Sequence, residues 1–354
     1  MKKVAVFLLL LLLTASCKNA STVNTSGEDY VFGMDFQKNF HSGHGGITAC
    51  ESESGFLFIK NFFLYYIEKS SMQTTIVCTK LECLHNDNKC NAFVPSDQLT
   101  YYDNKLYYLE YGSSGNIIIS MDLDGSNRKN LFSYINERSS YDYLIHRGYA
   151  YFVEDLCLYS VQLNNTNRRA KVYEFSDSYY FNLWGDGDYV FICAENLNFS
   201  EEFYRYDLSS AKCEKVWSVN SINEDWMTKG KLVNGWYISN GVIYYYLSGN
   251  GIWKHDFDSQ EYSKIADISD PSQCGHDGYA SFDENGIYID SSSSLNQQDP
   301  SKYAIHIYDY QGVLTDTIPI GDIYNERELT YFYCLYNGSK TLAFQAKPLG
   351  QLAR

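Results

Sequence analysis

Short apolar runs alternate with tight polar turns along most of this chain. Each of seven such runs ends in a two-residue turn, after which a strand-like segment rich in aromatic residues begins. The seven turns are Ser54-Gly55, Asp103-Asn104, Arg147-Gly148, Asp186-Gly187, Asn240-Gly241, Asn285-Gly286 and Asn337-Gly338. Asn-Gly and Asp-Gly pairs accept positive φ and therefore suit tight β-hairpins. The second turn residue recurs at intervals of 39 to 54 residues, which indicates an internal repeat.

Two more strand candidates follow each of the first six turns. In the second unit they are NIIISMDL and RKNLFSY, and in the fifth they are GIWKHDF and YSKIAD. Four strands per unit without helical periodicity are typical of a β-propeller, in which each blade buries both faces against its neighbours. We therefore predict an all-β fold, a β-propeller of seven four-stranded blades, with six or eight blades as alternatives. The alternative, two lipocalin-like or sandwich domains, is less favoured because such domains would not require seven equivalent turns.

The repeat also predicts the innermost strand of every blade, which should precede each turn. These strands are expected at 46–50, 98–102, 142–146, 179–184, 231–239, 278–282 and 330–336. The seventh unit has too little chain after its hairpin for two more strands. Because a propeller ring can be closed by a strand from the other terminus, we expect residues 28–36, EDYVFGMDF, to supply it.

The first residues have the pattern of a targeting segment. Lys2 and Lys3 precede an apolar run of about ten residues, too short to span a bilayer, and small residues lead to Cys17. This pattern predicts a lipoprotein signal peptide at 1–16 and lipidation of Cys17, although Thr14 replaces the usual leucine; an ordinary secretory signal is the alternative. The predicted organisation is then a lipid-anchored tether with the ring-closing strand at 17–45, and a single propeller domain at 46–354.

Composition and charge narrow the set of partners. The chain has 34 tyrosines but only 5 prolines, a composition that favours strands, and its formal net charge is −15. Such a chain repels phosphate backbones, so we expect no nucleic acid partner. We predict a location in the bacterial cell envelope, extracytoplasmic and anchored to the membrane by lipid, with a glycan, a peptide or a cell-envelope protein as the partner.

The segment CTKLECLHNDNKCNAF, residues 78–93, carries the densest candidate chemistry. Cys78, Cys83, His85 and Cys90 form a Cys3His set with two zinc-like gaps of four residues. One interpretation is a disulfide or free structural cysteines, because extracytoplasmic thiols tend to oxidise. A structural zinc or iron ion is the second interpretation, and a redox or catalytic site is the third. Covalent haem attachment is excluded, since Leu84 separates Cys83 from the histidine. With a metal ion or a disulfide, we expect the segment to be an ordered link between blades one and two.

Catalytic arrangements are poorly represented, and we predict no catalytic residues. There is no G-x-S-x-G motif, and Cys274-Gly275-His276-Asp277 are too close in sequence to converge as a triad. A carbohydrate-active hydrolase or lyase would need converging carboxylates at the rim, for which Asp142, Asp186, Asp283 and Glu284 are the candidates. The favoured function is a binding or interaction module, with that enzyme as the alternative.

Three tryptophans are candidates for stacking on a ligand. Trp184, Trp226 and Trp236 fall near the expected inner edges or connecting loops of the blades. In these places an indole ring can pack against a sugar or a peptide.

Residues 119–132, ISMDLDGSNRKNLF, resemble the strand-turn-strand unit of TolB-like propellers. From about 46 to 346 the chain resembles a group of uncharacterised, tyrosine-rich propeller lipoproteins of anaerobic bacteria, which also carry a segment like 78–93. The resemblance implies a propeller fold and a lipoprotein anchor, and it implies no known activity.

Overall fold

The computed structural model describes residues 49–347 apart from 72, 97, 113–114, 136–142, 177–179, 197–199, 221–232, 248–249, 269–279, 284, 291–303, 320–327 and 332–344. Within these residues every regular element is a β-strand. The fold class predicted from the sequence, all-β, is therefore confirmed. No helix in this part of the chain is long and apolar enough to cross a membrane.

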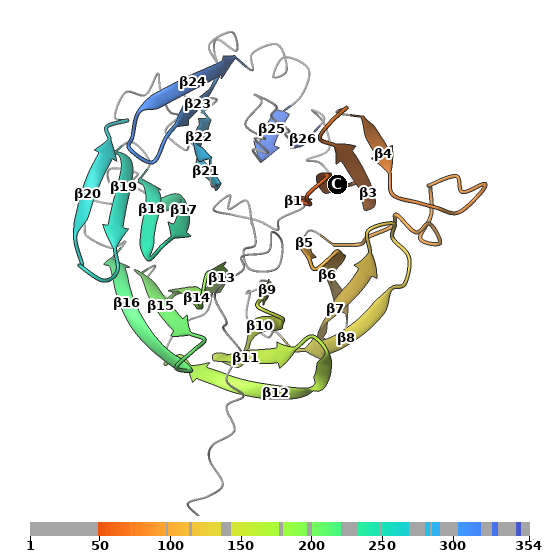
Figure 1. Ribbon diagram of the computed structural model, residues 1–354, viewed down its shortest axis with the longest axis horizontal. Coiled ribbons are helices and arrows are strands. Elements are labelled where there is room, and N and C mark those ends of the chain that lie inside the picture. The colour runs from red at the N-terminus through yellow and green to blue at the C-terminus, as the bar shows by residue number, and fades with distance from the viewer. Residues whose placement is uncertain are drawn as a thin grey trace, which may run out of the picture.

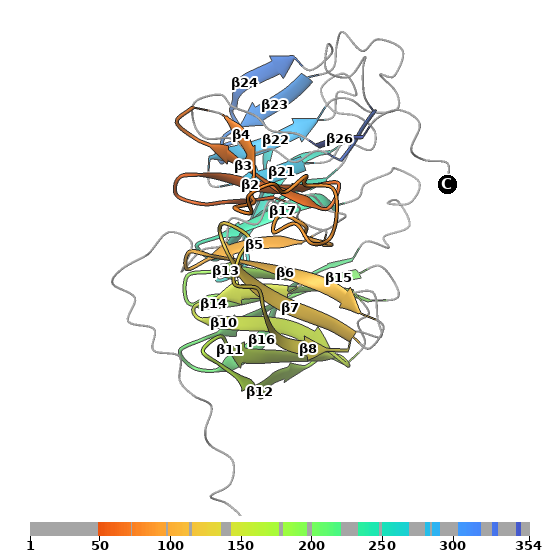
Figure 2. The same ribbon diagram turned by 90° about the vertical axis from the view of Figure 1, so that its right-hand side faces the viewer.

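The strands form six four-stranded antiparallel sheets arranged around a ring (Figure 1). Blade 1 is β1 (Ala49–Glu51), β2 (Gly55–Lys60), β3 (Phe63–Glu68) and β4 (Thr74–Ile76); blade 2 is β5 (Leu99–Tyr102), β6 (Lys105–Gly112), β7 (Gly115–Asp122) and β8 (Lys129–Tyr134); blade 3 is β9 (Tyr143–His146), β10 (Tyr149–Glu154), β11 (Cys157–Gln162) and β12 (Asn165–Glu174). Blade 4 is β13 (Tyr180–Asp186), β14 (Tyr189–Glu195), β15 (Ser200–Asp207) and β16 (Lys212–Asn220); blade 5 is β17 (Val233–Ser239), β18 (Val242–Leu247), β19 (Gly251–Asp256) and β20 (Tyr262–Ala266); blade 6 is β21 (Ala280–Asp283), β22 (Gly286–Asp290), β23 (Ala304–Tyr308) and β24 (Leu314–Pro319). Figure 2 shows the same ring from its edge.

The expectation of seven four-stranded blades is corrected to six, the lower alternative. After blade 6 the described residues form a two-stranded sheet, from β25 (Glu328–Tyr331) and β26 (Gln345–Lys347). It lies between blade 6 and blade 1 in Figure 1. The sequence already shows the reason, because too little chain follows the seventh hairpin to build two outer strands. The proposed ring-closing strand at 28–36 lies outside the described residues.

The innermost strands of the six blades are β1, β5, β9, β13, β17 and β21, and each overlaps its predicted range. Their side chains are almost all buried, as in β5 and β9, where all four residues are buried. The outermost strands are far more exposed, and β12 has no fully buried residue. Successive inner strands contact one another, and the apolar clusters lie between neighbouring blades. Burial on both faces explains why the apolar runs are continuous instead of alternating.

The predicted hairpin turns are confirmed at Asp103-Asn104, Arg147-Gly148 and Asn240-Gly241, where both central residues have positive φ. At Asp186 the turn begins one residue later, because Asp186 stays paired with Tyr189. The hairpin of blade 6 also differs by one residue, with Asp283 paired to Gly286. In blade 1 the connection is wider, since the last paired residue before it is Glu51. The turn at Asn337-Gly338 lies outside the described residues.

These turns also connect one blade to the next. The backbone N–H of Gly148 donates to the hydroxyl of Tyr102 in blade 2 at 2.7 Å. The Nε2 of His146 donates to the carbonyl of Gly187 in blade 4 at 2.8 Å. The N–H of Asn240 in blade 5 donates to the Asp186 carboxylate at 2.7 Å. At three successive boundaries between blades, the residue before one turn therefore forms a hydrogen bond with the turn of the next blade.

Candidate metal centre

The segment that follows β4 leaves the ring and returns along blade 1 (Figure 1). On its return the backbone pairs with β3: Leu64 N–H donates to Ala92 O and Val94 N–H donates to Phe62 O, both at 2.7 Å. Ala92 and Val94 are fully buried. The end of the segment is therefore fixed to the blade by backbone hydrogen bonds and by apolar contact, which makes it an ordered part of the structure.

Four side chains of this segment converge on one region. The sulfurs of Cys78, Cys83 and Cys90 and a ring nitrogen of His85 all lie within 4.8 Å of one another. Ligands around a tetrahedral zinc ion with Zn–S bonds near 2.3 Å stand about 3.8 Å apart, so the donors need to close by no more than about 1 Å. The shortest distance between ring nitrogen and sulfur is 3.3 Å, from His85 Nδ1 to Cys90 Sγ. The three cysteines carry free thiols.

Backbone N–H groups support a negative charge on the sulfurs. Burial acts to raise the pKa of the Cys78 thiol, but N–H groups of Lys80 and Asn91 donate to its sulfur, and the pKa falls to about 7. Burial raises the pKa of Cys90 to about 11, although Ala92 N–H donates to its sulfur at 3.3 Å. Three thiols this close cannot all ionise without a cation between them, because like charges raise each other's pKa. A divalent metal ion would remove that conflict.

The loop is also attached to blade 2. Arg128, in the hairpin between β7 and β8, donates from Nη2 to the carbonyl of Asn91 and from Nη1 to the Tyr108 hydroxyl at 3.3 Å. Gly125 in the same hairpin has φ +77, and a Cβ there would lie 2.4 Å from Asn91 O. A glycine is therefore required at this close approach. Residues 78–93 thus contact both blade 1 and blade 2, and the predicted link between these blades is present.

The tip of the segment is solvent-exposed. Leu81 and Leu84 flank Cys83 and are 95% and 82% exposed. Glu82 and His85 take left-handed backbone conformations, with φ of 61° and 53°. Both leucine side chains point to solvent, so at the tip only the cysteines, such as Cys83, pack against the apolar cluster of the blades.

The tryptophan candidates are placed differently from the prediction. Trp184 and Trp236 are buried, at 1% and 4% exposure, and their rings pack edge to face at 5.8 Å. The indole N–H of Trp184 donates to Ile238 O at 3.0 Å. Neither ring offers an open face to a ligand, because both point into the core between blades 4 and 5. Trp226 lies outside the described residues.

Of the candidate rim acids, Asp186 has a structural role. Burial raises its pKa, and the N–H groups of Asn240 and Gly241 donate to the carboxylate in partial compensation. Residues 142 and 284 and the stretch 274–277 lie outside the described part of the chain. Asp283 ends β21 and pairs with Gly286. The structure therefore brings none of these acids together in the part that it describes.

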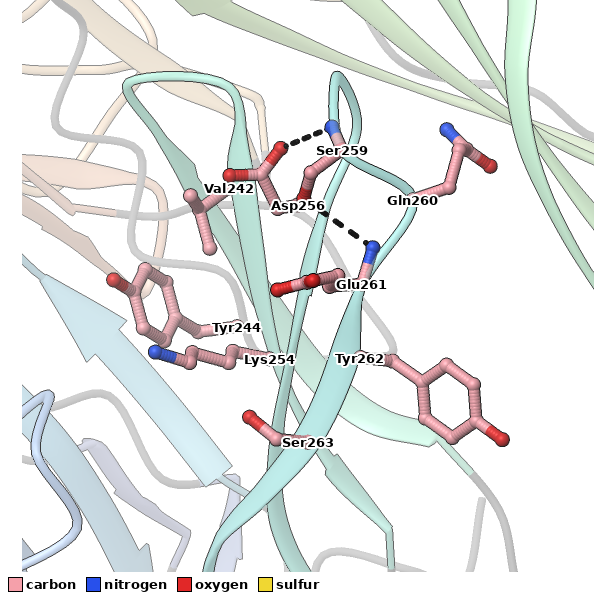
Figure 3. A pocket seen from close by; sticks show the side chains of 9 residues that line it. All are labelled: Val242, Tyr244, Lys254, Asp256, Ser259, Gln260, Glu261, Tyr262 and Ser263. Carbon is pink, nitrogen blue, oxygen red and sulfur yellow. Dashed lines mark hydrogen bonds between the residues drawn. The ribbon is translucent and has the colours of Figure 1, made fainter.

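A pocket of about 510 Å³ lies on one face of blade 5 (Figure 3). Tyr244, Lys254 and Ser263 form a row across β18, β19 and β20, and Asp256 and Glu261 lie nearby. The Asp256 carboxylate accepts N–H groups of Asp258 and Ser259, both at 2.9 Å, and so caps its own turn. Most of the lining side chains are exposed. The pocket is open and polar, and its best-placed carboxylate, that of Asp256, already accepts hydrogen bonds from its own turn.

Sequence reasoning missed two features. One is Arg128, whose contact with a carbonyl 37 residues earlier no local pattern reveals. The other is Glu201 on β15, which lies directly opposite Glu195 on the neighbouring strand β14. Burial, and then the charge of Glu195, raise the pKa of Glu201 to about 7. No sequence signal marks this pair, because both acids occur in ordinary strand segments.

No protein-family model matches this sequence, and no curated protein matches it. Among solved structures, a prolyl endopeptidase is similar with a TM-score of 0.48 at 10% identity, over 80% of this chain and 43% of that one. An oligogalacturonate lyase solved with manganese gives 0.44 at 10% identity, over 70% and 74%. TolB from Acinetobacter baumannii gives 0.39 at 11% identity, over 75% and 61%. All three similarities have an identity of 11% or less and a TM-score below 0.5.

Proposed function

We propose that this chain is an extracytoplasmic, lipid-anchored propeller that binds a ligand or a cell-envelope partner, and that residues 78–90 hold a structural zinc or iron ion. The observation that carries the proposal is the convergence of Cys78, Cys83, His85 and Cys90. Four protein donors fill a tetrahedral shell and leave no position for a substrate or a catalytic water. The metal therefore serves the architecture, and the protein acts by binding.

The role of the metal follows from the position of the loop. Its two ends are fixed to blade 1 and its Asn91 carbonyl to blade 2, whereas the leucines at its tip are exposed and bury little apolar surface to offset the entropy of ordering. A metal ion that links Cys78 to Cys90 closes the loop and removes much of that freedom. A disulfide between two of the cysteines would close it less completely and would leave His85 without a function.

The stabilising role is tested with Cys83→Ser and with a matched control, Cys157→Ser. Cys157 lies in blade 3, distant from the loop, and is also a free thiol. We expect Cys83→Ser to lower the melting temperature by several degrees and to make it insensitive to added chelator. Cys157→Ser should remain sensitive to chelator in the same way as the wild type. An unchanged melting temperature for Cys83→Ser would show that the loop needs no bound ion.

The binding role is tested with the full chain in detergent on glycan and peptide arrays. A specific hit that survives Cys83→Ser would separate the ligand site from the metal centre. The absence of any hit, together with turnover of an oligosaccharide, would replace the binding function by the second candidate.

That second candidate is a carbohydrate-active hydrolase or lyase, and one observation favours it. Glu195 and Glu201 face each other on neighbouring strands, and the pKa of Glu201 lies near 7, where a general acid is effective. The described pocket lies in blade 5 and not beside this pair in blade 4, so the enzyme ranks second. Loss of turnover in Glu201→Gln, with folding preserved, would support it.

A further inference from the structure

We infer that Arg128 of blade 2 is a positioning residue for the metal centre of blade 1, acting through the peptide group of Asn91. This inference rests on the proposed metal site and concerns what determines its affinity. The Asn91 carbonyl accepts from Arg128 Nη2, and Asn91 lies directly between the ligand Cys90 and Ala92, whose N–H donates to the sulfur of Cys90 at 3.3 Å. Asn91 therefore connects a cysteine ligand of the proposed metal site to the guanidinium group of Arg128 in the next blade.

The guanidinium group is itself held in place. Its centre lies 5.8 Å from the centroid of the Tyr108 ring, Nη1 donates to the Tyr108 hydroxyl, and Nε donates to Gly125 O at 3.4 Å. Tyr108 is only 1% exposed, so its ring gives a rigid platform. Arginine supplies several donors in one plane, which lysine cannot do. Arg128 can thus fix the orientation of the Asn91 carbonyl relative to blade 2.

Fixing that carbonyl also fixes a hydrogen bond to the Cys90 sulfur. If the segment at Asn91 turns, the N–H of Ala92 no longer points at that sulfur, and the thiolate loses this backbone donor. Groups that orient metal ligands without touching the ion typically change metal affinity by about 10–100-fold. Since binding is reciprocal, the metal ion must in turn strengthen the attachment of the loop to blade 2.

Blade 3 supplies a matched control for the test. Arg169 lies over the Phe152 ring of its own blade at 5.4 Å and donates to Ser133 O of blade 2. It also pairs with Glu154 at 2.8 Å. The seam between blades 2 and 3 thus uses the same combination of an arginine, an aromatic ring and a neighbouring carbonyl, but without a cysteine cluster. Arg169→Leu disturbs a seam of the ring without disturbing the metal loop.

The experiment measures the dissociation constants for cobalt and zinc by competition with a chromophoric chelator, using the full chain in detergent with reduced thiols. We expect Arg128→Leu to weaken binding about 10-fold, Arg128→Lys to recover part of the loss, and Arg169→Leu to leave the constant unchanged. The thiolate-to-cobalt absorption band should keep its intensity in every variant, because no ligand is removed. If Arg128→Leu does not fold, Tyr108→Phe, which removes only the hydroxyl partner, should weaken binding by a smaller factor.

The outcomes separate the two proposals. Equal affinities in wild type and Arg128→Leu, or an equal loss in Arg169→Leu, would overturn the positioning role while leaving the metal site intact. A loss of absorption intensity in Arg128→Leu would show that the variant alters the ligand set, which also contradicts the inference. A wild-type protein that binds neither ion would refute the metal site and the inference with it.

Discussion

A carboxyl pair gives this protein a pH-dependent stability. Glu201 lies directly opposite Glu195 on the neighbouring strand, and both residues are half-buried. The Oε2 atom of Glu201 is itself buried and has no hydrogen-bond partner among the described residues. Burial, with a smaller contribution from the charge of Glu195, raises the pKa of Glu201 from 4.5 to about 7. The folded state therefore holds this proton more tightly than the unfolded state does.

The sign and the size of the effect follow from linkage. Between about pH 4.5 and pH 7 the folded state binds more protons at this carboxyl group, so the free energy of unfolding falls as the pH rises through that window. Each tenfold difference in proton affinity corresponds to about 1.4 kcal/mol, so the loss amounts to roughly 3 kcal/mol at pH 8. Glu201→Gln cannot ionise, and we expect it to be about 3 kcal/mol more stable than the wild type at pH 8 and nearly equal to it at pH 5.

The assay is urea unfolding followed by tryptophan fluorescence at pH 5 and pH 8, at one ionic strength. The neighbouring Glu202 provides the control with the opposite sign. Burial acts to raise the pKa of Glu202, but the Tyr204 hydroxyl at 2.6 Å and Lys215 at 3.0 Å outweigh it and lower that pKa. Glu202 therefore stabilises the fold above its unfolded pKa, and Glu202→Gln should destabilise it at pH 8. A difference between wild type and Glu201→Gln that is the same at both pH values would refute the reasoning.

Two further predictions concern a buried histidine and the membrane anchor. His255 is 3% exposed, stacks on Trp217 at 4.7 Å, and has no hydrogen-bond partner at either ring nitrogen within the described structure; burial lowers its pKa. Stability due to the neutral ring is therefore lost as the pH falls below the ordinary value of 6.5. Between pH 7 and pH 5 the melting temperature of His255→Phe should fall by less than that of the wild type. Equal falls in the two proteins would contradict this prediction. For the anchor, Cys17→Ser should move the protein from the membrane fraction to the soluble fraction on an immunoblot. If the variant stays in the membrane fraction with signal cleavage unchanged, Cys17 is not the lipidated residue.

The repeat predicted much of the architecture because its signals are local. A turn that accepts positive φ, followed by an apolar run, defines a hairpin without reference to the rest of the chain, and six inner strands were placed in this way. The number of full blades was predicted as seven, with six as an alternative, because it depends on whether distant segments supply the outer strands. The one-residue displacement at Asp186 is also a tertiary effect, since its carboxylate accepts Asn240 N–H from the next blade.

The candidate sites were also predicted only where their sequence signals are local. The spacing of cysteines in 78–90 was enough to name the four donors that the structure brings together. The contact with Arg128 comes from a segment of blade 2 that meets this loop only in the folded ring. The tryptophan prediction failed for Trp184 and Trp236 because both faces of an inner strand are buried, so sequence alternation cannot show which side chains reach solvent.

The central claim is that Cys78, Cys83, His85 and Cys90 hold a metal ion that closes the loop between blade 1 and blade 2. The most direct measurement is elemental analysis of the wild type and of Cys83→Ser, both purified without oxygen. The account predicts about one zinc or iron ion per chain in the wild type, in line with four protein donors to a single ion, and a strong reduction in the variant. A metal-free wild type whose intact mass is lower by two hydrogens, as a disulfide requires, would contradict it.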